Sequence, residues 1–138
     1  RSQDTLLKWL RRITVPGGIA HAFNGSSQQA QEFLKLGFKL GFGGAATYNG
    51  SKRIRTLAAT LPEDALVLET DSPDMPPQWL EDGLQQPGFR SRNTPDQLPK
   101  IAAHIALLRS VSLEDLAHQC SINTCQALPA LKRLLQAN

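Results

Sequence analysis

Short apolar segments of strand composition alternate with amphipathic helical segments along the first half of this chain. The strand segments are residues 18–23, 38–42 and 65–71, and the helical segments between them are residues 26–36 and 51–60. Each connection is long enough for a helix and too long for a hairpin, so we expect parallel strands joined by right-handed helical crossovers. The sequence therefore predicts an α/β fold built on a parallel sheet.

The rest of the chain is predicted to be helical apart from one long loop. An amphipathic helix over residues 4–10 precedes the first strand. Residues 72–95 are rich in proline, glycine and glutamine, and a loop of this length is usually functional or mobile. Further helices are expected over residues 98–108, from Ser112 onward, and in a tail interrupted at Pro129. We find no internal repeat and no second domain.

Composition limits the class of protein. The chain has 138 residues, of which 41% are hydrophobic and 20% charged, enough for one globular domain and too polar for a membrane span. The net charge of +3 suits anionic partners, but the basic residues are dispersed, so charge alone does not establish nucleic-acid binding. Cys120 and Cys125 match no zinc or thioredoxin spacing, so we expect reduced thiols in a cytoplasmic protein. The sequence begins at Arg1 in a helix-like stretch, and we expect further residues upstream.

Two acidic residues end the third predicted strand. Glu69 and Asp71 project to the same side because successive side chains on a strand alternate, and Pro73 stops the strand. A buried strand that ends in two carboxylates delivers acidic groups to the edge of a sheet, where we expect a functional site. The alternative is that both acids are solvated or paired with nearby lysine or arginine side chains.

His21 lies near the carboxyl end of the first predicted strand, where barrel enzymes place catalytic groups. A neutral imidazole there could bind a divalent ion; the alternative is a core histidine bonded to a backbone carbonyl. Asn24, Gly25 and Ser26 then lead into a helix, whose unpaired backbone amides could receive an anionic substrate. An ordinary helix N-cap by Ser26 or Ser27 is equally compatible with this segment.

Other basic side chains have simpler interpretations. Lys52, Arg53 and Arg55 form a basic helix start that could touch DNA phosphates, but a solvated helix face is favoured. His104 and His118 fall within predicted helices away from the strand ends, so we interpret them as surface or packing residues.

Three motifs, taken in order and with their spacing, resemble the later motifs of TatD-type metal-dependent deoxyribonucleases. They are His-Ala-Phe-Asn-Gly-Ser at residues 21–26, Glu-Thr-Asp-Ser-Pro at residues 69–73, and Arg-Asn-Thr-Pro at residues 92–95, which opens a helix. The resemblance covers nearly the whole chain. Members of this family are (β/α)₈ barrels related to the amidohydrolases, and they hydrolyse phosphodiester bonds in DNA with divalent metal ions at the barrel mouth.

The resemblance implies roles for the residues at the strand ends. His21 and Asp71 match family metal ligands, and the ion could be zinc, magnesium or manganese. Asp71 would also orient or deprotonate the attacking water, whereas Glu69, one layer deeper, would orient other groups.

The long loop carries the third motif. Arg90, Arg92 and Asn93 are expected to order the mouth of the site or to contact the substrate, which the resemblance implies is DNA. Thr94 departs from the family, because a glutamate is expected between the asparagine and the proline, so no role of that carboxylate is transferred to this chain.

Other family motifs have no counterpart in this sequence. The His-x-His pair of the opening strand, a mid-barrel glutamate and the histidine of the fifth strand are all absent. We therefore interpret residues 1–138 as a single partial domain, the C-terminal half of a (β/α)₈ TIM barrel with strands six to eight, since complete barrels have about 250 residues. Three parallel strands cannot close a barrel. The folded state should need the missing N-terminal half, from a longer polypeptide, a separate chain or another copy.

The predicted function is metal-dependent hydrolysis, in which the full-length enzyme cleaves DNA phosphodiester bonds with a metal-activated water. We expect the fragment alone to be inactive. One alternative is amidohydrolase-like cleavage of an ester, lactone or amide, because the same activated water attacks carbonyl carbon. Another is a noncatalytic remnant or a basic module that binds nucleic acid or a protein partner.

Overall fold

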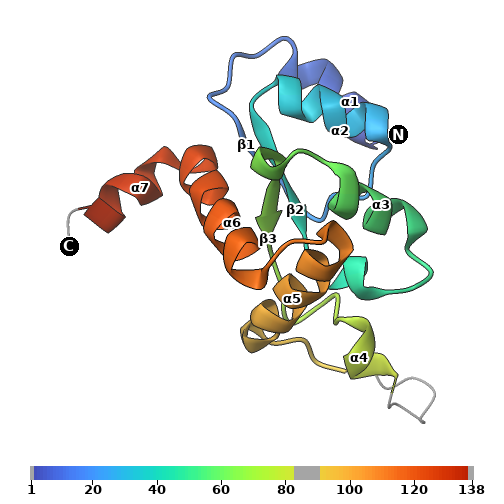
Figure 1. Cartoon of the computed structure of the whole chain (residues 1–138). Coiled ribbons are helices and arrows are strands. Elements are labelled where there is room, and N and C mark those ends of the chain that lie inside the picture. Colours follow the sequence, from blue (N-terminus) through green and yellow to red (C-terminus); the bar gives the residue numbers. More distant parts are fainter. Residues whose placement is uncertain (1, 83–90, 137–138) are drawn as a thin grey trace.

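Three parallel strands form one sheet in the computed structural model, which describes residues 2–82 and 91–136 (Figure 1). The strands are β1 (Gly18–Ala20), β2 (Phe38–Phe42) and β3 (Leu66–Leu68), in the spatial order β1-β2-β3. Both neighbouring pairs are parallel, with Ala20 opposite Leu40 and Leu40 opposite Leu66. The predicted α/β architecture with parallel strands is therefore confirmed.

Helices connect and flank the strands as the hydrophobic periodicity predicts. Helix α2 (Ser27–Lys35) packs on β2, α6 (Leu113–Ala127) packs on β3, and α3 (Lys52–Thr60) packs against α5 (Leu98–Arg109). Helix α7 follows a break at Leu128 and extends away from the body of the molecule in Figure 1. The α-helices are α1 (Ser2–Leu10), α2 (Ser27–Lys35), α3 (Lys52–Thr60), α4 (Gln78–Glu81), α5 (Leu98–Arg109), α6 (Leu113–Ala127) and α7 (Pro129–Gln136), and the 3₁₀ turns are η1 (Gly44–Thr47), η2 (Glu63–Ala65) and η3 (Pro95–Gln97).

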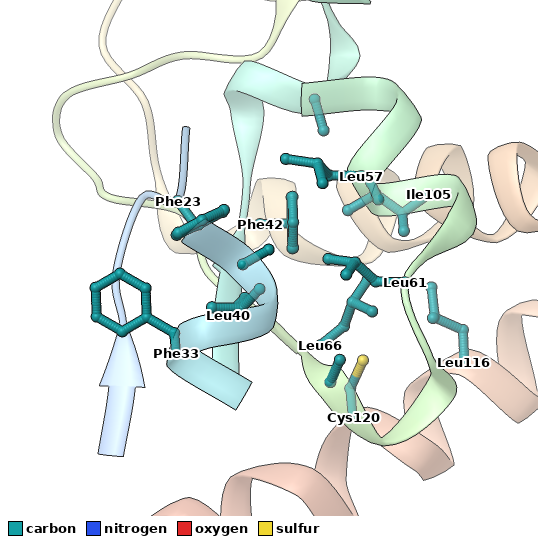
Figure 2. Packing of buried hydrophobic residues seen from close by; sticks show 14 of the residues in the cluster. Phe23, Phe33, Leu40, Phe42, Leu57, Leu61, Leu66, Ile105, Leu116 and Cys120 are labelled. Atoms are coloured by element: carbon teal, nitrogen blue, oxygen red, sulfur yellow. The ribbon is translucent and has the colours of Figure 1, made fainter. Parts of the chain in front are cut away.

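Side chains from the sheet and the helices around it form the hydrophobic core. Figure 2 shows Phe33 of α2, Leu40 and Phe42 of β2, and Leu66 of β3 in this cluster. Each of these side chains is at most 1% exposed, and burying one contributes about 1.5–3 kcal/mol. The rings of Phe23 and Phe33 meet edge to face, with centroids 5.8 Å apart, which packs the segment after β1 against α2.

The outer strands are shorter than the sequence predicts. Strand β1 ends at Ala20, because Ala22 adopts a φ of 47° and turns the chain. Strand β3 ends at Leu68, and Asp71 has a φ of 59°. The alternation of a regular strand therefore does not explain where the side chain of Asp71 points. The prediction that strand alternation orients Asp71 was therefore wrong, because the turn at Asp71 orients its carboxylate.

The long loop after β3 is partly helical. Residues 72–95 were expected to be a loop, but they contain the one-turn helix α4. In the described part of the chain, β1 and β3 each pair with β2 alone, so the three strands form an open sheet. Among the same residues, no helix has the length and apolar character needed to cross a membrane.

Candidate metal centre

His21 lies between two carboxylates at the carboxyl ends of the strands. His21 is the first residue after β1, and Glu69 is the first residue after β3. The imidazole Nδ1 lies 2.7 Å from Oε2 of Glu69, and Nε2 lies 2.8 Å from Oδ1 of Asp71. Residues about 50 positions apart in the sequence are thus brought together across β2, as the parallel topology predicts.

Gly41 leaves the space that this contact needs. Strand β2 separates β1 from β3, so the side chain of Glu69 must cross β2 to reach His21. A Cβ atom at Gly41 would collide with the carboxylate of Glu69, and one at Gly43 would collide with its backbone oxygen. Sequence reasoning did not identify Gly41 as a site residue. A glycine inside a predicted buried strand is the signal that could have found it.

Glu69 is the more buried of the two acids. Its side chain is 14% exposed, and its Oε1 accepts a hydrogen bond of 2.7 Å from the backbone N–H of Ala22. Burial raises the pKa of Glu69, while the hydrogen bond from Ala22 and the charge of His21 act in the opposite direction. The two oxygens of Glu69 therefore fix both the ring of His21 and the turn that follows it.

The charge of Glu69 raises the pKa of His21, and hydrogen bonds with Asp71 and Glu69 act in the same direction against the effect of burial. Each ring nitrogen faces a carboxyl oxygen, so when both carboxyl groups are ionised the two contacts require both nitrogens to donate, as in the imidazolium. A divalent cation on Nε2 would replace one of these protons and leave Nδ1–H to donate to Glu69. The donor set therefore suits a cation between His21 and Asp71.

Among the described residues, no group of three or more His, Cys, Asp or Glu side chains is arranged to hold a metal ion. His21 and Asp71 supply one imidazole nitrogen and carboxylate oxygens, which are ligand types that zinc and manganese accept. The residues present thus fit part of a divalent site.

One cavity borders this cluster, and a second cavity lies next to the first. A cavity of about 170 Å³ is lined by residues that include Asn24, Glu69 and Asp71. A larger one of about 620 Å³ is lined by residues that include Arg92, and both cavities touch Ala45 and Met75. A substrate could therefore extend from the carboxylates toward Arg92.

The segment after β1 caps a helix. Ser26 Oγ accepts from the backbone N–H of Gln29, whose side chain accepts from the backbone N–H of Ser26. Asn24 accepts a 3.0 Å hydrogen bond from Gln3, and Gly25 lies so close to Phe23 that a Cβ atom would collide with the ring. The N-cap interpretation of Ser26 is confirmed. Substrate contact by this turn stays a prediction.

Asn93 does not reach the cavity surface. Its residue is 1% exposed, and its side-chain amide donates to backbone oxygens in the loop that follows Asp71. The prediction that Asn93 contacts the substrate is therefore wrong. Its hydrogen bonds fit the other expected role, which is to order the loop at the mouth of the site. Arg92 is exposed, and Arg90 lies outside the described residues.

The remaining basic side chains behave mostly as predicted. Lys52 and Arg53 are exposed, and so is His118. Arg55 differs from a solvated residue, because its Nη1 lies 2.9 Å from Nε2 of His104. His104 is half-buried beside the ring of Trp79, which confirms its interpretation as a packing residue.

The fold and the cluster agree with the comparisons to known families. The family of TatD related DNases matches this chain over residues 1–129. The chain therefore belongs to the TatD family, as the three motifs indicated.

Curated relatives support this assignment. The chain is 37% identical over 126 residues to YjjV of Escherichia coli (strain K12), named an uncharacterized metal-dependent hydrolase, covering 90% of this chain and 45% of YjjV. It is also 37% identical over 107 residues to the 3'-5' ssDNA/RNA exonuclease TatD of Rahnella sp. (strain Y9602), covering 76% of this chain and 38% of that protein. The chain thus spans less than half the length of these relatives.

Solved structures agree with the fold. The crystal structure of YjjV, described as a TatD homologue, matches with a TM-score of 0.79 at 36% identity, covering 92% of this chain and 46% of YjjV. A TatD-family hydrolase from Entamoeba histolytica matches with a TM-score of 0.65, covering 90% of this chain and 46% of that one. Its identity of 18% supports the fold alone.

Proposed function

We propose that this chain forms part of a metal-dependent hydrolase that cleaves phosphodiester bonds in nucleic acid, with DNA as the substrate. The observation that carries the proposal is the placement of His21 between Glu69 and Asp71 at the carboxyl ends of parallel strands. Relatives named metal-dependent hydrolases support the reaction type, and those named 3'-5' ssDNA/RNA exonucleases support a nucleic-acid substrate.

His21 and Asp71 would hold the divalent ion, which could be zinc, manganese or magnesium. When bound, such an ion lowers the pKa of a coordinated water and offsets charge that develops on a phosphoryl oxygen. Glu69 keeps the imidazole in place by accepting from Nδ1–H, so that with an ion bound Nε2 would be the ring nitrogen that holds it on the side of Asp71.

Asp71 is the residue that we assign to the attacking water. Its side chain is 33% exposed, against 14% for Glu69, so Asp71 is the acid that water and substrate can reach. A carboxylate at this position can accept a hydrogen bond from the water and then take its proton. Arg92, exposed on the larger cavity, is proposed to contact a phosphate of the substrate.

We further propose that residues 1–138 are a partial domain, the C-terminal half of a (β/α)₈ barrel with strands six to eight. The open sheet and the short coverage of the relatives support this. The remaining strands would come from a longer polypeptide, a separate chain or another copy, and we call the whole assembly the completed barrel. The chain alone is expected to be inactive, because its described residues supply only part of a metal site.

The cytoplasmic location predicted from Cys120 and Cys125, both free thiols, stays a prediction.

The test is an Asp71→Asn variant of the completed barrel, assayed on single-stranded DNA, RNA and an aryl ester with and without Mn²⁺. Loss of a general base costs about 100-fold to 10,000-fold in rate, so metal-stimulated DNA cleavage should fall by at least about 100-fold while the circular dichroism spectrum is unchanged. Asp96→Asn, at an exposed acid in η3, is the control. Unchanged DNA cleavage by Asp71→Asn would remove Asp71 from this role, and ester cleavage without DNA cleavage would favour the carbonyl reaction.

A further inference from the structure

Two asparagines in the described part of the chain are almost completely buried, and each holds one end of the segment that carries the acids. Asn123 of α6 is 0% exposed and Asn93 is 1% exposed. Asn123 donates from Nδ2 to the backbone oxygens of Glu63, at 2.8 Å, and Leu66, at 2.7 Å. It therefore braces the start of β3, at the end of the strand away from His21.

Asn93 braces the other end of this segment. Its Nδ2 donates to the backbone oxygens of Thr70, at 2.6 Å, and Asp74, at 2.8 Å, with a longer contact of 3.3 Å to Met75. Its own backbone N–H donates to the backbone oxygen of Pro73 at 3.0 Å. Every one of these acceptors belongs to the loop that follows β3.

The contacts of Asn93 lie on both sides of Asp71. Thr70 directly precedes Asp71, and the other acceptors follow it by two to four residues. Asp71 has a φ of 59°, a backbone region that residues with a side chain rarely adopt, and its backbone oxygen accepts from the N–H of Asp74 at 2.9 Å. A strained residue keeps such a conformation only when its surroundings hold it there.

We propose that Asn93 is a positioning residue that holds Asp71 against His21. Among the hydrogen bonds of the described residues, none joins Asn93 to His21 or to the Asp71 carboxylate. Asn93 acts through the backbone of residues 70–75, whose turn aims that carboxylate. Removing its amide group would take the side-chain donor away from the backbone carbonyls of Thr70 and Asp74 and free both sides of the turn. The proposal rests on the proposed function only for its statement that Asp71 binds a metal ion.

Asn123 provides a matched control, since it is equally buried and also donates to two backbone carbonyls of the same segment. We would compare Asn93→Ala with Asn123→Ala in the completed barrel. The measurements are the melting temperature, amide hydrogen exchange of Asp74 without metal, and the dissociation constant for Mn²⁺ by calorimetry at a temperature where all proteins are folded.

Both variants should have lower melting temperatures, but only Asn93→Ala should affect the site. Its Mn²⁺ dissociation constant should rise at least about tenfold, the range seen when groups that orient metal ligands are lost, while Asn123→Ala stays within about twofold of the parent. Exchange at Asp74 should be faster in Asn93→Ala than in Asn123→Ala. Asn93→Ser, which keeps one donor, should give an intermediate dissociation constant.

Equal Mn²⁺ affinities and equal exchange at Asp74 in the two alanine variants would overturn the proposal. So would failure of both Asn93 variants to fold while Asn123→Ala folds, because Asn93 would then be a residue of global stability. If the parent protein itself binds no Mn²⁺, the proposed function fails instead, and the exchange measurement still decides whether Asn93 holds the Asp71 turn.

Discussion

Gly41 lies directly beneath the carboxylate of Glu69. Because Gly41 has no side chain, the side chain of Glu69 can cross the central strand and reach His21. The central strand therefore contributes to the site by leaving space for the Glu69 side chain. Any Cβ atom at Gly41 would occupy the position of the Glu69 carboxylate.

Gly41→Ala should therefore destabilise the protein and displace Glu69 from His21. Overpacking a buried position costs about 1–3 kcal/mol, which urea denaturation of the completed barrel would measure. Gly50→Ala is the control, because a Cβ atom at Gly50 meets no atom within 4 Å. If Gly41→Ala is as stable as Gly50→Ala, the carboxylate of Glu69 does not need this space.

Glu69→Gln should lower the pKa of His21. The negative charge of Glu69 is the largest cause of the raised pKa of His21, and glutamine keeps the size of the side chain while removing that charge. Titration of the His21 ring by NMR in the metal-free completed barrel would measure the change. Glu63→Gln, at an exposed position before β3, should leave the titration as it is. An unchanged His21 pKa in Glu69→Gln would show that the two groups are not coupled.

His104 should make the folded state less stable in mild acid. Burial, aided by the charge of Arg55, lowers its pKa from 6.5 in the folded protein, so the unfolded chain takes up a proton at a higher pH than the folded chain does. The free energy of unfolding should then fall as the pH drops below about 6.5 and level off once the folded state is also protonated.

The contribution of His104 can be isolated by substitution. The stability advantage of the parent over His104→Gln, measured by urea denaturation, should shrink between pH 7.5 and pH 5. His118→Gln, at an exposed position in α6, should show no such pH dependence. A difference between parent and His104→Gln that is constant with pH would contradict the lowered pKa.

The sequence was sufficient to predict the parallel sheet, the connecting helices and the grouping of His21 with Asp71. Apolar runs and helical spacing mark the elements directly, and parallel strands bring their carboxyl ends to one edge. Strand β2 was predicted with its observed bounds, because residues 38–42 form a compact run between a helix-ending glycine and a glycine pair.

What the sequence did not reveal depends on contacts between distant residues. The burial of Asn93 follows from loop carbonyls that only the folded loop brings together, and the pairing of Arg55 with His104 joins helices α3 and α5. The turn at Asp71 could not be predicted either, since aspartate adopts a positive φ only where its surroundings hold it.

The central claim is that His21 and Asp71 bind one divalent ion. The most direct measurement is anomalous diffraction from crystals of the completed barrel grown with Zn²⁺. We predict an anomalous peak about 2.0–2.2 Å from both Nε2 of His21 and a carboxylate oxygen of Asp71, with Nδ1 still bonded to Glu69. An anomalous peak at another position, with His21 and Asp71 still in direct contact, would contradict the assignment of these two residues as ligands of one ion.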